Sequence, residues 1–209
     1  MKGRIQTRNE ELANGISHIL GIIFCLIGMP FLIAKAREHN LIMESSVIIF
    51  GIGMLLVYSF SSLYHLAQKE KTKQLFKIAD HISIYYLIAG TYSPLMVIYL
   101  NKETALIFLG IMWSIVLLGS FFKIFYVDRF KFISVALYLL MGWMIVFVIK
   151  PLWGVMPFSV FLWILAGGLS YTVGVYFYVK GYKSYFHTIW HFFVLLGTVF
   201  HYVAILESL

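Results

Sequence analysis

Charge is scarce in this sequence. Only 12% of its 209 residues are Asp, Glu, Lys or Arg, whereas 61% are hydrophobic. A soluble domain of this size is about 45–50% apolar. The composition therefore excludes an ordinary soluble domain and predicts an integral membrane protein, and the length fits a single domain.

Cysteine and acidic residues are also few. Cys25 is the only cysteine, so no disulfide can form within the chain, and one thiol says nothing about the redox compartment. Nine acidic residues against sixteen Lys and Arg give a formal net charge of +7. The basic residues fall in short clusters between apolar runs, where membrane topology explains them. We therefore expect no nucleic-acid partner.

Seven apolar runs are long enough to cross a bilayer, which takes about 20 residues as a helix. Backbone groups in lipid must bond internally, so these runs are helices. The sequence predicts an all-α seven-transmembrane helix bundle, a single membrane domain over residues 1–209 with residues 1–15 as a short cytoplasmic N-terminal segment. Two of the four prolines, Pro30 and Pro94, are predicted to kink their helices. The runs cover residues 16–36, 45–67, 78–100, 104–122, 132–149, 158–179 and 186–206.

The basic residues also predict the orientation. Twelve of them lie in the N-terminal segment and in the loops after the second, fourth and sixth runs, and four lie in the other loops. Short loops rich in Lys and Arg stay in the cytoplasm. We therefore expect the N-terminus in the cytoplasm, the C-terminus outside, and a multi-pass protein of the plasma membrane.

On this map, polar residues collect at the cytoplasmic ends of three runs. "SSLYH" ends the second run with Ser61 and His65, "IADHIS" opens the third with Asp80, and "FHTIWH" opens the seventh with His187 and His191. Residues four apart share a helix face, so His187 and His191 can reach one ion, and Ser61 lies beside His65. Ionisable groups within membrane spans are costly and indicate a functional site.

Three histidines are a ligand set typical of catalytic zinc, which leaves a further position for water. We predict a zinc ion (Zn²⁺) as the cofactor, with His65, His187 and His191 as its ligands. The residues between His187 and His191 include no acid, unlike the H-E-x-x-H motif, so Asp80 is the candidate catalytic base. The alternative is that these histidines are hydrogen-bonded within the bundle, because an HxxxH spacing alone is a weak motif.

Four stretches together resemble a known family: "EELANGISHILG", "SSLYH", "ADHISIYYLIAGTYSP" and "HTIWHFFVLLGTVFH". They are similar to the progestin and adipoQ receptor superfamily, in its bacterial haemolysin III-like branch. The resemblance implies a seven-helix fold with the N-terminus inside, a zinc ion on His65, His187 and His191, Asp80 near its bound water, and Ser61 as a supporting residue. Members of the superfamily are associated with ceramide hydrolysis. The bacterial branch is named for haemolysis and is also linked to membrane homeostasis.

Further polar residues fall near the predicted ligands. Glu11, Asn14 and His18 share one face at the start of the first helix. We expect them to form a hydrogen-bonded helix start; the alternative is that they close the site or orient its ligands, with His18 as a reserve ligand. His201 lies about 21 Å along the helix from His187, at 1.5 Å per residue, so it cannot bind the same ion. We expect it to make a polar contact inside the bundle.

Two classes of function stay open. The first is a ceramidase-like zinc hydrolase that cleaves an amide or ester of a membrane lipid at the inner leaflet. The second is a non-enzymatic sensor, membrane-homeostasis or haemolytic, pore-forming protein, with a structural zinc and membrane lipid as a ligand. Structural zinc usually has four protein ligands, so three histidines and a carboxylate favour the hydrolase. The sequence names no protein partner.

Overall fold

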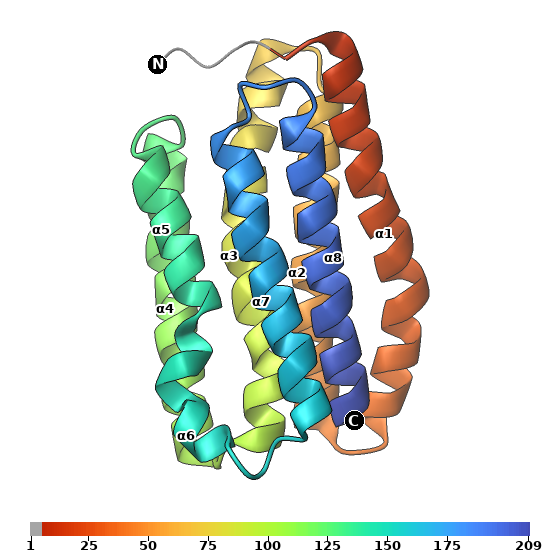
Figure 1. Cartoon of the computed structure of the whole chain (residues 1–209), viewed down its shortest axis with the longest axis vertical. Coiled ribbons are helices and arrows are strands. Elements are labelled where there is room, and N and C mark those ends of the chain that lie inside the picture. The colour runs from red at the N-terminus through yellow and green to blue at the C-terminus, as the bar shows by residue number, and fades with distance from the viewer. Residues whose placement is uncertain (1–5) are drawn as a thin grey trace.

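The computed structural model describes residues 6–209, and in that range it is an all-helical bundle. Seven helical segments are long and apolar enough to cross a membrane, so the predicted fold class is confirmed. Figure 1 shows them side by side along the long axis of the molecule. The elements are α1 (Arg8–Arg37), α2 (Leu41–Leu66), α3 (Glu70–Tyr99), α4 (Lys102–Tyr126), α5 (Lys131–Gly142), the 3₁₀ helix η1 (Met144–Val148), α6 (Ile149–Leu152), α7 (Phe158–Val179) and α8 (Phe186–Ser208).

The helices extend beyond the apolar runs. Helix α1 begins at Arg8 because Thr7 and Glu10 form a capping box: the Thr7 hydroxyl oxygen accepts from the Glu10 N–H, and the Glu10 carboxylate accepts from the Thr7 N–H at 2.9 Å. Part of the predicted N-terminal segment, residues 1–15, is thus the first turns of a helix. Lys2 and Arg4, which entered the orientation argument, lie outside the described residues.

The fifth span is broken, although the sequence predicts one continuous helix over residues 132–149. Helix α5 ends at Gly142, and the chain continues as η1 and α6. Tyr92 of α3 explains the break: its hydroxyl donates to the Gly142 carbonyl at 2.6 Å and accepts from the Ile145 N–H at 3.2 Å. One side chain satisfies two backbone groups that a helix would otherwise pair internally. Pro30 and Pro94, by contrast, lie inside unbroken helices.

Helices α2 and α3 approach each other closely through glycine. A methyl group at Gly53 would lie 2.9 Å from the Tyr86 carbonyl oxygen, and one at Gly90 would lie 3.1 Å from the Ile49 carbonyl oxygen. Small residues allow this close backbone contact between membrane helices. The contact sets the relative position of the two helices that carry His65 and Asp80.

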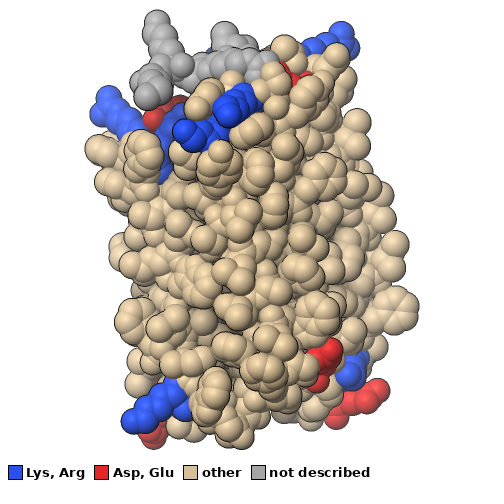
Figure 2. Space-filling model, viewed as in Figure 1, with Lys and Arg blue, Asp and Glu red and all other residues tan. Residues whose placement is uncertain are grey.

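The surface suits a lipid environment. Figure 2 shows the charged side chains gathered at the two ends of the bundle, with an uncharged surface between them on the face drawn. Large apolar side chains along the spans are exposed; Leu26 of α1, for example, is 64% exposed. Lipid tails solvate such side chains well, whereas water does not, so the exposed belt is consistent with a multi-pass membrane protein.

Candidate metal centre

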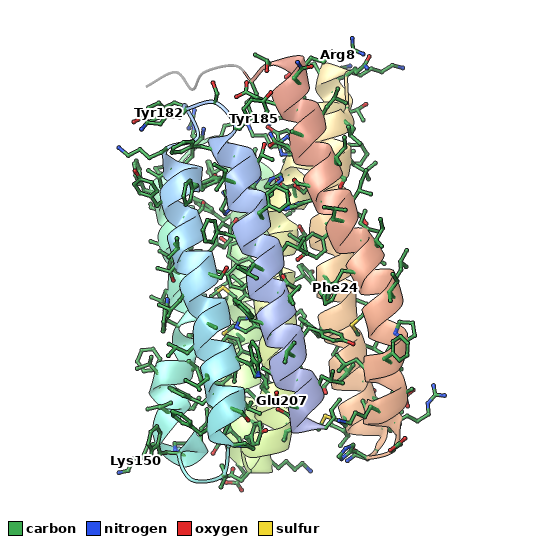
Figure 3. The ribbon with its side chains drawn as sticks, turned by 45° about the vertical axis from the view of Figure 1, so that its right-hand side comes forward. Arg8, Phe24, Lys150, Tyr182, Tyr185 and Glu207 are labelled. Carbon is green, nitrogen blue, oxygen red and sulfur yellow. The ribbon has the colours of Figure 1, made fainter. Side chains whose placement is uncertain are left out.

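Three helix ends meet at one end of the bundle. The end of α2 and the beginnings of α3 and α8 lie together at the end where α1 starts (Figure 1). Figure 3 labels Arg8 and Tyr185 at this end, and Lys150 and Glu207 at the other. The common depth of the polar segments is therefore as predicted; that this end faces the cytoplasm stays a prediction.

The three predicted ligands form one cluster. His65, His187 and His191 each offer a ring nitrogen, and these nitrogens lie within 4.8 Å of one another. The ring centroids are 5.0 Å apart for His65 and His187, and 4.7 Å apart for His187 and His191. His65 and His191 are buried, and His187 is partly buried. Imidazole nitrogens gathered in this way can bind a single metal ion.

The hydrogen bonds of two of these histidines leave the same ring nitrogen free. His65 uses Nδ1 to contact the Glu11 carboxylate at 2.7 Å, and His191 uses Nδ1 to contact the Ser17 hydroxyl oxygen at 2.9 Å. The Nε2 atom of each is buried and has no hydrogen-bond partner within residues 6–209. A buried polar atom without a partner costs about 1–3 kcal/mol. A zinc ion would satisfy both atoms, so the residues present fit that cofactor.

Asp80 lies outside the group of close nitrogens but is linked to the same region. Its side chain is buried near the Ser61 side chain, and its Oδ2 atom is 3.6 Å from Nδ1 of His81. Ser61 precedes His65 by one turn of α2. The structure thus places the predicted base and its predicted supporting residue together, on the helix pair that the glycine contact holds.

A cavity of about 120 Å³ reaches Asp80 from the middle of the bundle. Its wall is mainly apolar and aromatic, with a few polar groups, as in typical small-molecule sites. The lining includes Asp80, His18, Tyr138, Trp143, Tyr178 and His201. The cavity can therefore hold an apolar chain with one end beside a carboxyl group.

The remaining histidines of the bundle do not join the cluster. His18 stacks on His191 with ring centroids 3.7 Å apart, but it is not one of the three residues whose nitrogens lie close together. His201 contacts the Ile164 carbonyl oxygen of α7 through Nε2 at 3.2 Å, so the expected contact inside the bundle is confirmed.

Helix α1 contributes more to the site than the sequence suggested. We expected Glu11 and Asn14 to serve the start of the helix, yet Thr7 and Glu10 make its cap. Glu11 instead reaches His65, and the Asn14 carbonyl oxygen lies 3.2 Å from Nδ1 of His191. These contacts match the alternative given above, that Glu11 and Asn14 orient the ligands. Ser17 was missed, and its position three residues after Asn14, on the same helix face, was the signal that could have identified it.

Seven membrane-spanning helices with a buried histidine cluster at one end define the class of protein: an integral membrane protein with a candidate metal centre. The sequence model of the family described as Haemolysin-III related matches residues 6–202. The chain belongs to this family, within the progestin and adipoQ receptor superfamily that the sequence resembles. Family and spans together make it a multi-pass protein of the cell membrane.

Curated relatives cover nearly the whole chain. The "Hemolysin-3 homolog" of Bacillus subtilis (strain 168) is 39% identical over 96% of this chain and 94% of the relative. "Hemolysin-3" of Bacillus cereus is 39% identical over 94% of this chain and 90% of the relative. The human "Monocyte to macrophage differentiation factor" is 26% identical over 96% of this chain and 84% of the relative.

Proposed function

We propose that this protein is a zinc-dependent hydrolase of a membrane-lipid amide or ester. His65, His187 and His191 hold the metal, and Asp80 is the catalytic base. The observation that carries the proposal is the pair of buried, unpartnered Nε2 atoms in a cluster of three histidines. Three protein ligands are typical of catalytic zinc, whereas structural zinc usually has four.

The chemistry divides between the metal and the chain. When bound, zinc supplies a Lewis acid that polarises a carbonyl and makes water acidic enough to react near neutral pH. Asp80 takes a proton from the attacking water and returns it to the leaving group, and Ser61 lies near enough to hold the carboxyl group in place. Burial of both side chains limits competition from bulk water.

The apolar lining of the cavity favours a lipid as the substrate. Its wall is mainly apolar, and Asp80 lies in the lining. An acyl chain inside it would bring an amide or ester group to the carboxyl end of the cavity. Ceramide-like amides are one candidate class, and simple esters are another.

A second candidate function follows from the relatives' names. Two relatives that are 39% identical are named for haemolysis. In that case the same histidines hold a structural zinc that joins α2 to α8, and the output is membrane leakage or sensing rather than turnover. Purified protein in liposomes loaded with a fluorescent dye tests this directly, because leakage without lipid cleavage favours the second candidate.

The decisive test of the hydrolase is lipid mass spectrometry. The purified full chain, loaded with zinc in nanodiscs, is incubated with a panel of lipid amides and esters, beside a sample stripped by a chelator. We expect a cleaved product in the zinc-loaded sample alone. If no lipid in the panel is cleaved while zinc is bound, the hydrolase proposal fails.

The ligand set has its own test. We expect about one zinc per chain, and a sharp loss of zinc in His65→Ala, His187→Ala and His191→Ala. His201→Ala is the matched control, since His201 lies on the same helix as two of the ligands and contacts Ile164 instead. If all three single variants keep full zinc, the ligand assignment is wrong.

A further inference from the structure

Resting on the proposed zinc site, we propose that Glu11 is a positioning residue that fixes His65 in its metal-binding form. Its carboxylate joins three helices at the end of the bundle. Oε2 contacts Nδ1 of His65 on α2 at 2.7 Å, and Oε1 accepts from Nζ of Lys73 on α3 at 2.8 Å. The His65 side chain is 2% exposed, and the Glu11 and Lys73 side chains are 22% and 25% exposed.

The contact determines which nitrogen of His65 carries hydrogen. An ionised carboxylate can only accept hydrogen bonds, so Nδ1 of His65 must be the donor. The lone pair of the neutral ring then lies on Nε2, the buried atom that has no partner among the described residues. A carboxylate behind a histidine also raises the basicity of the ring as a ligand. Lys73 supports the arrangement because its ammonium group donates to the other carboxylate oxygen, Oε1, at 2.8 Å and so holds the carboxylate in place.

His191 is held in the same form by neutral groups. The Ser17 hydroxyl donates its one hydrogen to the Asn14 carbonyl oxygen at 2.7 Å, so its oxygen accepts from Nδ1 of His191. Helix α1 thus sets the tautomer of two of the three ligands, one through a charge and one through a hydroxyl. His187 makes no hydrogen bond with any residue in the described part of the chain. The charged contact is the stronger of the two, because hydrogen bonds to ionised groups are about twice as strong as neutral ones.

The test is zinc affinity in a Glu11→Gln variant of the full chain. The amide keeps the size of the side chain but removes its charge, and it can turn an N–H group toward His65. We expect zinc to bind about 10–100-fold more weakly, the usual range for residues that support a ligand. Competition with a chromophoric chelator measures this without any lipid substrate. Glu44→Gln is the matched control, because Glu44 has a similarly exposed side chain, 16%, and is paired with Arg37 at the other end of the bundle.

Spectra of the cobalt-substituted protein distinguish a residue that positions a metal ligand from one that only stabilises the fold. The visible absorption of bound Co²⁺ reports on ligand geometry, and we expect it to shift in Glu11→Gln and to stay unchanged in Glu44→Gln. A second variant, Lys73→Gln, keeps the carboxylate and should weaken zinc less than Glu11→Gln does. It also keeps the proposal testable should Glu11→Gln fold poorly, because a lower zinc affinity in a stably folded Lys73→Gln still supports it.

The outcomes distinguish this inference from the proposed function. If the wild type binds zinc and both Glu11→Gln and Lys73→Gln bind it equally tightly, the positioning role is wrong and the zinc site stands. A fall in apo-protein stability with an unchanged cobalt spectrum would make Glu11 a structural residue only. If the wild type binds no zinc, the site itself is wrong, and this inference is wrong with it.

Discussion

Asp80→Asn separates a catalytic metal centre from a structural one. The substitution exchanges one carboxylate oxygen for an amide group of the same size, so the buried side chain still fills its place. Asp80 is not among the three residues whose ligand atoms lie within 4.8 Å of one another. We therefore expect Asp80→Asn to keep most of its zinc and nearly the melting temperature of the parent.

The expected loss of turnover follows from the role of the carboxylate. A neutral amide cannot accept a proton, and general acid–base groups contribute about 10²–10⁴-fold to rate. At about 1.36 kcal/mol for each factor of ten, the barrier rises by about 2.7–5.4 kcal/mol.

Three measurements on one preparation are enough: zinc per chain, melting temperature, and product formed from any lipid that the parent cleaves. Asp128→Asn is the matched control, because it makes the same exchange in the connection between α4 and α5, where the side chain is 53% exposed. Joint loss of zinc and melting temperature in Asp80→Asn would refute an open site, since losing a structural metal removes folding energy. Retained zinc without turnover in the parent would favour the sensor or haemolytic function.

Further predictions concern topology, pH and packing. Cysteine labelling should find position 71 on the cytoplasmic side and position 39 outside; the reverse would overturn the assigned orientation. Burial acts to raise the pKa of Asp128, but hydrogen bonds from α3 outweigh it and lower the pKa overall. This stabilisation is present at neutral pH and lost as the pH falls below about 4, the ordinary aspartate value. Asp128→Asn should therefore be less stable than wild type at pH 7, by less than about 1 kcal/mol in the free energy of unfolding, and this difference should shrink as the pH is lowered below about 4. Gly53→Ala should destabilise the protein by about 1–3 kcal/mol in reversible unfolding. Gly110→Ala should not, because a methyl group there would meet no atom within 4 Å beyond the adjacent backbone of its own helix.

Much of this arrangement was predictable from the sequence. Apolar length gave the seven spans, and alternating topology brought His65, Asp80 and His191 to one end. The capping box at Thr7 and Glu10 was also visible as a T-x-x-E pattern, but a search for apolar runs passes over it. The lengths and order of the apolar runs thus predict well how deep a residue lies in the bundle.

Contacts between distant helices were not predictable in the same way. Glu11 and His65 are 54 residues apart, and Ser17 and His191 are 174 apart. Whether such side chains meet depends on how each helix is rotated about its axis, and the rotation is set by packing. The break in the fifth span has the same origin, because the hydroxyl that stabilises it belongs to α3.

The break in the fifth span also affects how firmly one part of the cavity wall is held in a single conformation. Tyr92, Gly142 and Trp143 all line the cavity, so its wall is held partly by two hydrogen bonds of one phenol. Each is worth about 0.5–1.5 kcal/mol net. Conformers separated by a few kcal/mol coexist, with the minor one at about 0.1–10%. We therefore expect this part of the wall to exchange between the observed form and a minor form in which the two hydrogen bonds of Tyr92 are broken.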